Sequence, residues 1–283
     1  MTEKLPIRLT WNIHWACNYR CSYCFFDGRW MEYAQRNAHR SADEWERIWT
    51  RIHELYGRTF VTITGGEPFI YPDFLEILRR LSRLHWPVNV STNSSVGLDE
   101  FAAAADPEKV SLSLSFHPQY QLIGEFTASV RSLRERKVNL GCLNFVAYPP
   151  FIPDIPGYAE KLAAMGESLK VIPFVGGYRG RNYPDGYTRE EKRALGLDSG
   201  WVEGKRRKGR LCTAGHRSAL ILPDGAATRC GQVGDTGIFG SVFDPAFRLQ
   251  ERPMPCEAEL CPCDEWKVIP DEKPPEEAGA YLP

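Results

Sequence analysis

Hydrophobic and polar residues alternate along six short segments in the first two thirds of the chain. These segments are rich in β-branched and aromatic residues, and we predict strands at residues 7–14, 59–64, 87–93, 110–117, 138–148 and 169–175. Apolar residues at helical spacing predict helices between them, at residues 41–56, 72–85, 98–105, 121–137 and 154–165. Six strand–helix repeats predict an α/β fold with a parallel sheet and helices on its outside.

The alternation within each strand indicates what the inside of the sheet contains. In the fourth strand Ser111, Ser113, Ser115 and His117 share one face, and leucine and phenylalanine residues occupy the other. Helices must cover an apolar outer face, so the polar face points inward. A closed barrel fills its interior with branched apolar side chains, and a polar interior therefore predicts a cavity. An antiparallel sheet with one solvated face is the alternative.

Composition narrows the possible partners and compartments. The 283 residues have ordinary hydrophobic and charged fractions, 43% and 25%, and a formal net charge of −1. A charge near zero gives no reason to expect a nucleic-acid or membrane partner, and no apolar run is long enough to span a bilayer. The N-terminus lacks a signal-peptide pattern, so we expect a cytoplasmic protein in which clustered cysteines bind metal rather than form disulfides.

The first cysteine group is the strongest chemical signal in the chain. Cys17, Cys21 and Cys24 follow the first predicted strand with the spacing C-x3-C-x2-C. Three thiolates can hold a four-iron, four-sulfur cluster and leave its fourth iron open. A structural zinc site would more naturally offer four ligands, and zinc or a disulfide cluster is the alternative. The segment Gly65-Gly66-Glu67-Pro68 follows the second predicted strand.

These two motifs in this order, with Tyr23 at the aromatic position before the last cysteine, resemble the radical S-adenosylmethionine (SAM) superfamily. The resemblance implies an open six-stranded (β/α)6 partial TIM barrel. It implies that the open iron of the [4Fe–4S] cluster holds SAM, which the reduced cluster cleaves to a 5′-deoxyadenosyl radical. That radical would abstract hydrogen from a C–H bond of the substrate.

The resemblance also suggests roles for single residues. Gly65, Gly66 and Glu67 should meet the methionine amino group of SAM. Polar residues near the strand ends are candidates for its ribose and carboxylate: Ser91, Asn93, Ser113 and Ser115. Other inward polar residues are candidates for substrate contact, although each could equally be a hydrogen-bonded interior residue: Asn12, His14, His117, Asn144 and Lys170.

Cys142 lies in the fifth predicted strand, in phase with Asn144, so its thiol should point into the cavity. A thiol can give a hydrogen atom to a substrate radical, which would make Cys142 catalytic in an epimerase. Free cysteine is also often a small buried hydrophobic residue, which is the alternative.

A second cysteine group lies near the C-terminus. Pro223-Asp224-Gly225 predicts a hairpin turn that brings Cys212 and Cys230 together. The pattern resembles the auxiliary modules named twitch and SPASM, and implies a second, auxiliary [4Fe–4S] cluster held by four of five cysteines: Cys212, Cys230, Cys256, Cys261 and Cys263. A structural zinc site is the alternative.

The predicted organisation has three parts. Residues 1–178 form the partial barrel, and residues 179–210 form a linker with a short helix at 189–195, capped by Thr188. Residues 211–283 form the auxiliary module. The basic run at 205–208 is expected to be a solvated part of the linker.

The substrate is less well defined. The chain begins almost at the first strand, without a segment resembling a leader-peptide binding domain, so we expect a small or medium polar substrate. The resemblance to twitch enzymes suggests that an auxiliary cluster accepts the substrate electron, which would make the enzyme an oxidoreductase, and a flavodoxin or ferredoxin is the expected electron donor. A peptide- or protein-modifying maturase is the second reading, and a non-catalytic electron-transfer protein is the third.

Overall fold

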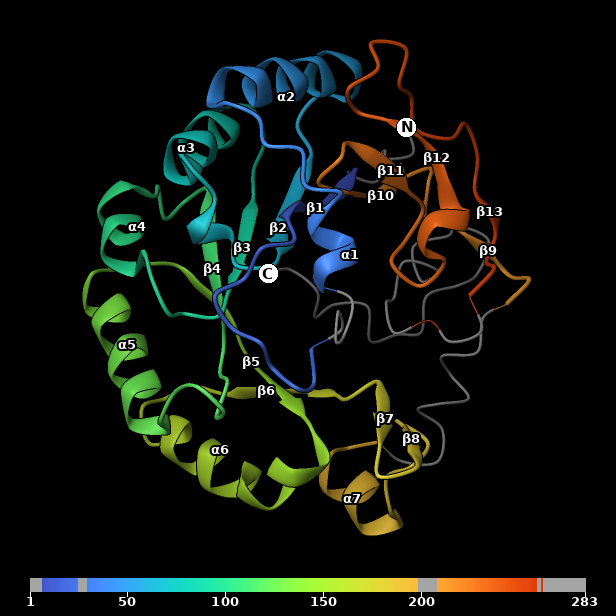
Figure 1. The fold of residues 1–283 in the computed structure, drawn as a ribbon. Helices are drawn as coiled ribbons and strands as arrows, with labels where there is room; N and C mark the ends of the chain where they lie inside the picture. Colours follow the sequence, from blue (N-terminus) through green and yellow to red (C-terminus); the bar gives the residue numbers. More distant parts are fainter. Residues whose placement is uncertain (1–6, 25–29, 198–207, 259–260, 262–283) are drawn as a thin grey trace, which may run out of the picture.

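The computed structural model describes residues 7–24, 30–197, 208–258 and 261. Its centre is a nine-stranded sheet with the order β12-β11-β10-β1-β2-β3-β4-β5-β6 (Figure 1). Six strands run parallel in chain order: β1 (Arg8–His14), β2 (Phe60–Gly65), β3 (Val88–Thr92), β4 (Val110–Ser115), β5 (Leu140–Ala147) and β6 (Leu169–Pro173). The six strands predicted from the sequence are confirmed, with ends that differ by a few residues. The sheet curves into the predicted partial barrel (Figure 1).

A helix follows each of the strands β1 to β5, and these five helices cover the outer face of the sheet (Figure 1). They are α2 (Ala42–Tyr56), α3 (Phe74–Leu84), α4 (Leu98–Ala104), α5 (Ile123–Glu135) and α6 (Ile155–Ala163). Ser41 begins α2 with a capping box, in which its side chain accepts from the backbone N–H of Glu44 and the Glu44 side chain accepts from the backbone N–H of Ser41. In the described part of the chain, no helix is long and apolar enough to cross a membrane.

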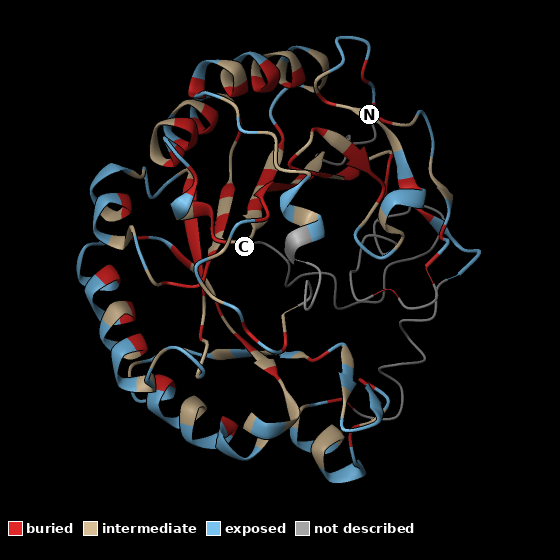
Figure 2. Ribbon diagram, viewed as in Figure 1, coloured by how far each residue is buried: buried red, intermediate tan, exposed pale blue. Residues whose placement is uncertain are grey.

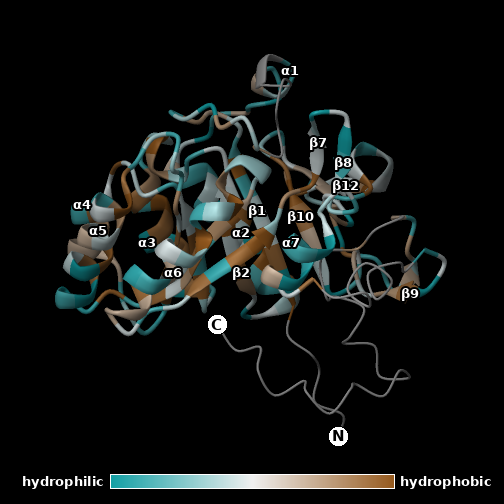
Figure 3. Cartoon of the chain, turned by 90° about the horizontal axis from the view of Figure 1, so that it is seen from below, coloured by the Kyte–Doolittle hydropathy of each residue, from teal (hydrophilic) through white to brown (hydrophobic). Residues whose placement is uncertain are grey.

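The core lies between the sheet and these helices, where the buried residues gather in Figure 2. Trp11 of β1 packs against two tryptophans of α2, with ring centroids 4.4 Å from Trp45 and 5.2 Å from Trp49. The helices are amphipathic, and in Figure 3 they carry both hydrophobic and hydrophilic segments. On the inner face, Asn89 donates to Ser111 and Ser113 over 2.9 and 3.0 Å. Part of the polar interior is therefore satisfied by hydrogen bonds between strands.

The C-terminal hairpin joins the same sheet. Strand β10 (Ser218–Ile221) pairs in parallel with β1, and β11 (Ala226–Thr228) and β12 (Ile238–Ser241) continue the sheet in antiparallel order. The predicted turn at Pro223-Asp224-Gly225 connects β10 to β11, and Gly225 has the positive φ of 81° that such a turn requires. The sequence predicted the hairpin but not its position at the edge of β1.

The remaining elements are short. The segment predicted as a linker contains α7 (Arg189–Ala194), capped by Thr188 as predicted, and part of a hairpin of β7 (Gly176–Tyr178) and β8 (Arg181–Tyr183). The sequence also did not predict α1 (Trp30–Ala34), or the pairing of β9 (Leu211–Cys212) with β13 (Met254–Pro255). The described residues also contain three short 3-10 helices, at Pro68–Ile70, Pro149–Asp154 and Gly234–Gly237.

The fully buried His85 gives the fold a pH dependence. Its Nε2 donates to the carbonyl of Trp49 over 3.0 Å, and its Nδ1 accepts from the backbone N–H of Thr59 over 3.2 Å. Burial lowers the pKa of His85 to about 4, so the unfolded chain binds a proton between pH 6.5 and 4 while the folded chain does not. The free energy of unfolding should therefore fall as the pH falls through this window. We expect wild type to lose about 2 kcal/mol more than His85→Gln between pH 6.5 and 5, measured by denaturant unfolding. An equal loss in both proteins would contradict this assignment.

Candidate active site

A cavity of about 390 Å³ opens at the carboxyl ends of the parallel strands. Carboxyl ends of parallel strands meet at one edge of a sheet, where ligands of such folds bind. The loop after β1 contributes tyrosine and cysteine residues. The strands β2 to β6 and the residues directly after them contribute the rest of the lining, which is Cys17, Tyr19, Cys21, Tyr23, Cys24, Thr64, Gly65, Gly66, Ser91, Thr92, Asn93, Ser115, His117, Val146 and Ile172. We call this space the first cavity.

The three N-terminal cysteines line the first cavity together. The described cysteines form no disulfide, and Cys21 is buried. Burial raises the pKa of Cys17 and raises that of Cys21 to about 12, so these thiols are neutral until a cationic centre deprotonates them. Among the described residues no three His, Cys, Asp or Glu side chains approach closely enough to bind one metal ion, as a zinc site would require. Cysteines that each bind a different iron need no such geometry.

Two glycines allow the chain to pass close to this cysteine loop. Gly65 has a φ of 122°, which favours glycine, and a Cβ on Gly66 would lie only 1.8 Å from the carbonyl oxygen of Ala16. The backbone N–H of Gly66 donates to His14 over 2.8 Å, and that of Glu67 donates to Ala16 over 2.9 Å. These contacts join the end of β2 to the segment that leads into the cysteines, and both glycines line the first cavity.

Glu67 occupies a different position from its glycine neighbours. Its side chain is fully buried and accepts hydrogen bonds from the Thr92 hydroxyl and the backbone N–H of Asn93, each over 2.7 Å, and from Phe69 over 3.2 Å. Burial raises the pKa of Glu67, and these three bonds oppose that shift. The carboxylate holds the end of β3 and is not among the residues that line the first cavity, so its contact with the SAM amino group stays a prediction.

His117 lies against the cysteine loop. Its Nδ1 is 3.0 Å from the Tyr23 hydroxyl and 3.4 Å from the Cys21 sulfur. The His117 and Tyr23 rings stack with their centroids 5.8 Å apart. Burial lowers the pKa of His117 to about 4, so the ring is neutral near pH 7. Asn93 approaches the loop from β3, with its Nδ2 3.7 Å from the Cys17 sulfur. The ends of β3 and β4 thus position the cysteines.

The other predicted site residues do not all lie in the first cavity. Ser91, Asn93 and Ser115 line the first cavity with His117. Ser113 does not, since its hydroxyl accepts from Asn89 and from the backbone N–H of Cys142 over 3.1 Å.

The remaining candidates for substrate contact are also dispersed. The Nε2 of His14 donates to the carbonyl of Glu67 over 2.7 Å, and Asn12 lines a second cavity. Asn144 pairs with Lys170 in the β5–β6 register, and the Lys170 Nζ is 3.8 Å from the Cys142 sulfur. The inward phase of the strands placed these residues on one face, but it did not place them in one site.

Four cysteines of the second group lie around one small enclosure. Cys212, Cys230, Cys256 and Cys261 line one small enclosure with Ala214, Val233 and Ala258, while Cys263 lies outside the described residues. The pairing of β9 with β13 sets Cys212 opposite Met254. Arg229, which the sequence did not single out, connects these segments by donating to the carbonyls of Ala214, Met254 and Pro255 over 2.9 to 3.2 Å.

The fold and the cysteine-lined cavity agree with the family to which the N-terminal part of the chain is similar. Residues 11–137 match the family model of the Radical SAM superfamily, so this part of the chain is similar to a radical SAM domain. The superfamily implies a [4Fe–4S] cluster and S-adenosylmethionine as cofactors. The match ends at residue 137, so the identity of the C-terminal cysteine group as a twitch or SPASM module stays a prediction.

The chain is similar to radical SAM proteins with different substrates. It is 29% identical over 170 residues to a probable GTP 3′,8-cyclase of Methanococcus maripaludis, covering 56% of each protein. It is 32% identical over 139 residues to the mycofactocin maturase MftC of Mycobacterium ulcerans, covering 45% of this chain and 36% of that protein. The chain therefore spans about half the length, or less, of these relatives. The structure of native anSMEcpe with bound AdoMet and Cp18Cys peptide has a TM-score of 0.62 at 16% identity, over 84% of this chain and 78% of that one, which shows a shared fold.

Proposed function

We propose that the chain cleaves SAM reductively in the first cavity and uses the radical so produced to abstract hydrogen from a substrate. The observation that carries this proposal is the convergence of Cys17, Cys21 and Cys24 with Gly65 and Gly66 on one cavity. When bound, the cluster supplies the electron and SAM supplies the hydrogen-abstracting group. The thiols fit a cluster, and the two glycines let the end of β2 pack against the backbone that leads into the cysteines.

The chain's own residues position these groups. Ser91 and Ser115 offer neutral hydrogen-bonding groups at the strand ends, suited to a ribose and a carboxylate. The Asn93 carboxamide already donates to Asn18 over 2.9 Å and accepts from the backbone N–H of Ser95 over 3.0 Å. Tyr23, within the cysteine loop, is buried and stacks on His117, which fixes its ring at the edge of the cavity. Electron transfer into this site would come from a flavodoxin or ferredoxin.

We propose that Cys212, Cys230, Cys256 and Cys261 hold a second [4Fe–4S] cluster. Four cysteines around one enclosure supply the ligand number that such a cluster takes. This cluster would accept the electron that the substrate loses after hydrogen abstraction, so the net reaction would be an oxidation. Structural zinc is the competing occupant of a four-cysteine site.

Two substrate classes follow from different observations. A peptide is favoured by the similarity to MftC, a maturase, and by the shared fold with anSMEcpe, whose structure contains a peptide. A small polar metabolite is favoured by the similarity to a GTP 3′,8-cyclase. The mutual hydrogen bonds of Asn89, Ser111 and Ser113 leave fewer interior polar groups for a sugar, so we place the peptide first.

The test is SAM cleavage by protein reconstituted with iron and sulfide without oxygen. With dithionite as reductant, we expect methionine and 5′-deoxyadenosine in equal amounts. The absence of 5′-deoxyadenosine from a protein with a full iron content would refute the proposal. Precursor peptides and sugars added separately would distinguish the substrate classes by the mass of the product.

Cys142 provides a separate prediction about the outcome of the reaction. If its thiol gives hydrogen to the substrate radical, the product in deuterated water is an epimer with one deuterium at the inverted carbon. Cys142→Ala would then lose the epimer while 5′-deoxyadenosine still forms. An oxidised product whose yield does not change in Cys142→Ala would contradict this role and agree with the oxidation.

A further inference from the structure

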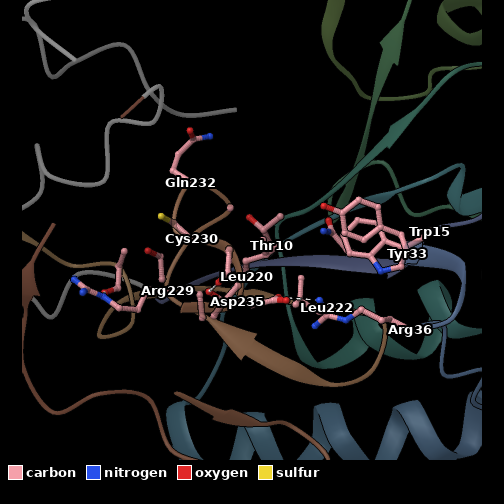
Figure 4. A pocket seen from close by; sticks show the side chains of 17 residues that line it. Thr10, Trp15, Tyr33, Arg36, Leu220, Leu222, Arg229, Cys230, Gln232 and Asp235 are labelled. Atoms are coloured by element: carbon pink, nitrogen blue, oxygen red, sulfur yellow. Dashed lines mark hydrogen bonds and ion pairs between the residues drawn. The ribbon is translucent and has the colours of Figure 1, made fainter. Parts of the chain in front are cut away.

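A second cavity, of about 420 Å³, lies where the C-terminal hairpin joins the barrel (Figure 4). It is bounded by β1, by the segment around α1, by β10 and β11, and by the loop that carries Cys230. It shares no lining residue with the first cavity. Cys230 and Ala214 line both this space and the four-cysteine enclosure. A ligand here would lie beside the proposed second cluster.

The walls of the second cavity are largely apolar. The rings of Trp15 and Tyr33 lie together on one side, with centroids 4.9 Å apart and planes tilted by 40°. Leu220 and Leu222 contribute apolar side chains from the hairpin (Figure 4). This side of the cavity favours an apolar or aromatic group, because a polar group placed against it would lose hydrogen bonds to water. The remaining lining includes the polar side chains of Thr10, Ser218, Thr228 and Gln232.

The charged groups at this cavity are already engaged. Arg36 forms ion pairs with Asp224 over 3.0 Å and with Asp235 over 2.8 Å, which connects the segment after α1 to the hairpin. Arg229 donates to backbone carbonyls of the auxiliary segments. Neither guanidinium is therefore the main recognition group for a charged ligand.

Asn12 is different. Its side chain lines the cavity and is only 6% exposed, yet its carboxamide makes no hydrogen bond to any described residue. Its amide atoms are open to the cavity, where a ligand can take the place of water as their hydrogen-bond partner. A carboxamide offers a donor and an acceptor side by side, which match the carbonyl and N–H of a peptide backbone.

We propose that the second cavity binds one residue of a peptide substrate, with an apolar or aromatic side chain between the Trp15–Tyr33 pair and Leu220. Asn12 pairs with the backbone of the same peptide. This proposal rests on the proposed function and deepens it by naming the part of the substrate that the cavity recognises. The two observations behind it, the apolar side of the cavity and an amide that faces the cavity without a partner among the described residues, are independent of each other.

The experiment is equilibrium dialysis of the reconstituted protein, with S-adenosylhomocysteine added to fill the first cavity. The probes are radiolabelled N-acetyl-phenylalanine amide, N-acetyl-serine amide and glucosamine. We expect saturable binding of the phenylalanine probe, at least about tenfold tighter than that of the other two. Leu220→Trp, which fills the cavity, should abolish binding. Asn12→Leu, which keeps the volume and removes the amide, should weaken it by about tenfold.

Matched controls carry the same exchanges at exposed positions. Leu122→Trp at the start of α5 and Asn182→Leu in β8 should leave the affinity of the phenylalanine probe unchanged. If Leu220→Trp does not fold with its normal iron content, Asn12→Leu decides the question. Equal binding of glucosamine, no saturable binding of the phenylalanine probe, or binding unchanged in Asn12→Leu would each overturn the proposal.

The two proposals can fail separately. Dialysis does not depend on SAM cleavage, so a protein that binds the phenylalanine probe but forms no 5′-deoxyadenosine refutes only the proposed function. A protein that cleaves SAM but binds no apolar probe refutes only the peptide subsite.

Discussion

Replacing Cys17, Cys21 and Cys24 together with alanine should remove one cluster and all SAM cleavage. These three thiols share the first cavity with Gly65 and Gly66, and no other described cysteine lines it. By ligand count, the reconstituted wild type should contain about eight irons, and the triple variant about four. The measurements are iron analysis and chromatography of 5′-deoxyadenosine after reduction.

Cys142→Ala is the matched control for this experiment, because it also removes a partly buried thiol from the barrel. Its iron content should equal that of wild type. If the triple variant still cleaves SAM, the first cavity is not where the reaction begins, and the assignment of all three cysteines is wrong. If Cys142→Ala loses iron as well, the count of four ligands in the second group is wrong.

The second large effect is expected from the double variant Cys212→Ala, Cys230→Ala. It should lose about four irons and retain the first cluster, because the two cysteine groups line separate cavities. SAM cleavage should continue, but oxidised product should not accumulate, since the proposed electron acceptor is absent. Metal analysis and product mass spectrometry measure the two effects.

The identity of the lost metal decides the role of this site. Loss of zinc instead of iron would exclude electron acceptance, because zinc has no redox chemistry. Loss of iron with an unchanged yield of oxidised product would mean that the cluster is present but does not accept the electron. Cys142→Ala again serves as the control for metal content.

The sequence predicted the barrel well because one physical constraint acts along each strand. Residues such as Leu112 and Leu114 pack under helices, and the residues between them face inward, so a period of two shows both the strand and its orientation. Where that constraint is missing, the prediction failed. The five residues of α1 are too few for a helical period, and β9 and β13 are each two residues long.

The site was predicted in part, for a similar reason. Spacing identified Cys17, Cys21 and Cys24, because the ligands of one cluster lie close together in the chain. The alternation of polar and apolar residues along the strands also placed Ser113 and His14 on the inner face. That alternation does not show which residue each side chain bonds to. Ser113 bonds to Asn89 and His14 bonds to Glu67, contacts between residues distant in sequence.

The pairing of β1 with β10 has a consequence for the newly synthesised chain. Residues 8–11 pair with residues 218–221, so one edge of the N-terminal strand has no partner until most of the protein has left the ribosome. A strand with an open edge can pair with other chains. A nascent or truncated chain that ends before β10 should therefore self-associate, and a chaperone that shields this edge would raise the yield of active protein.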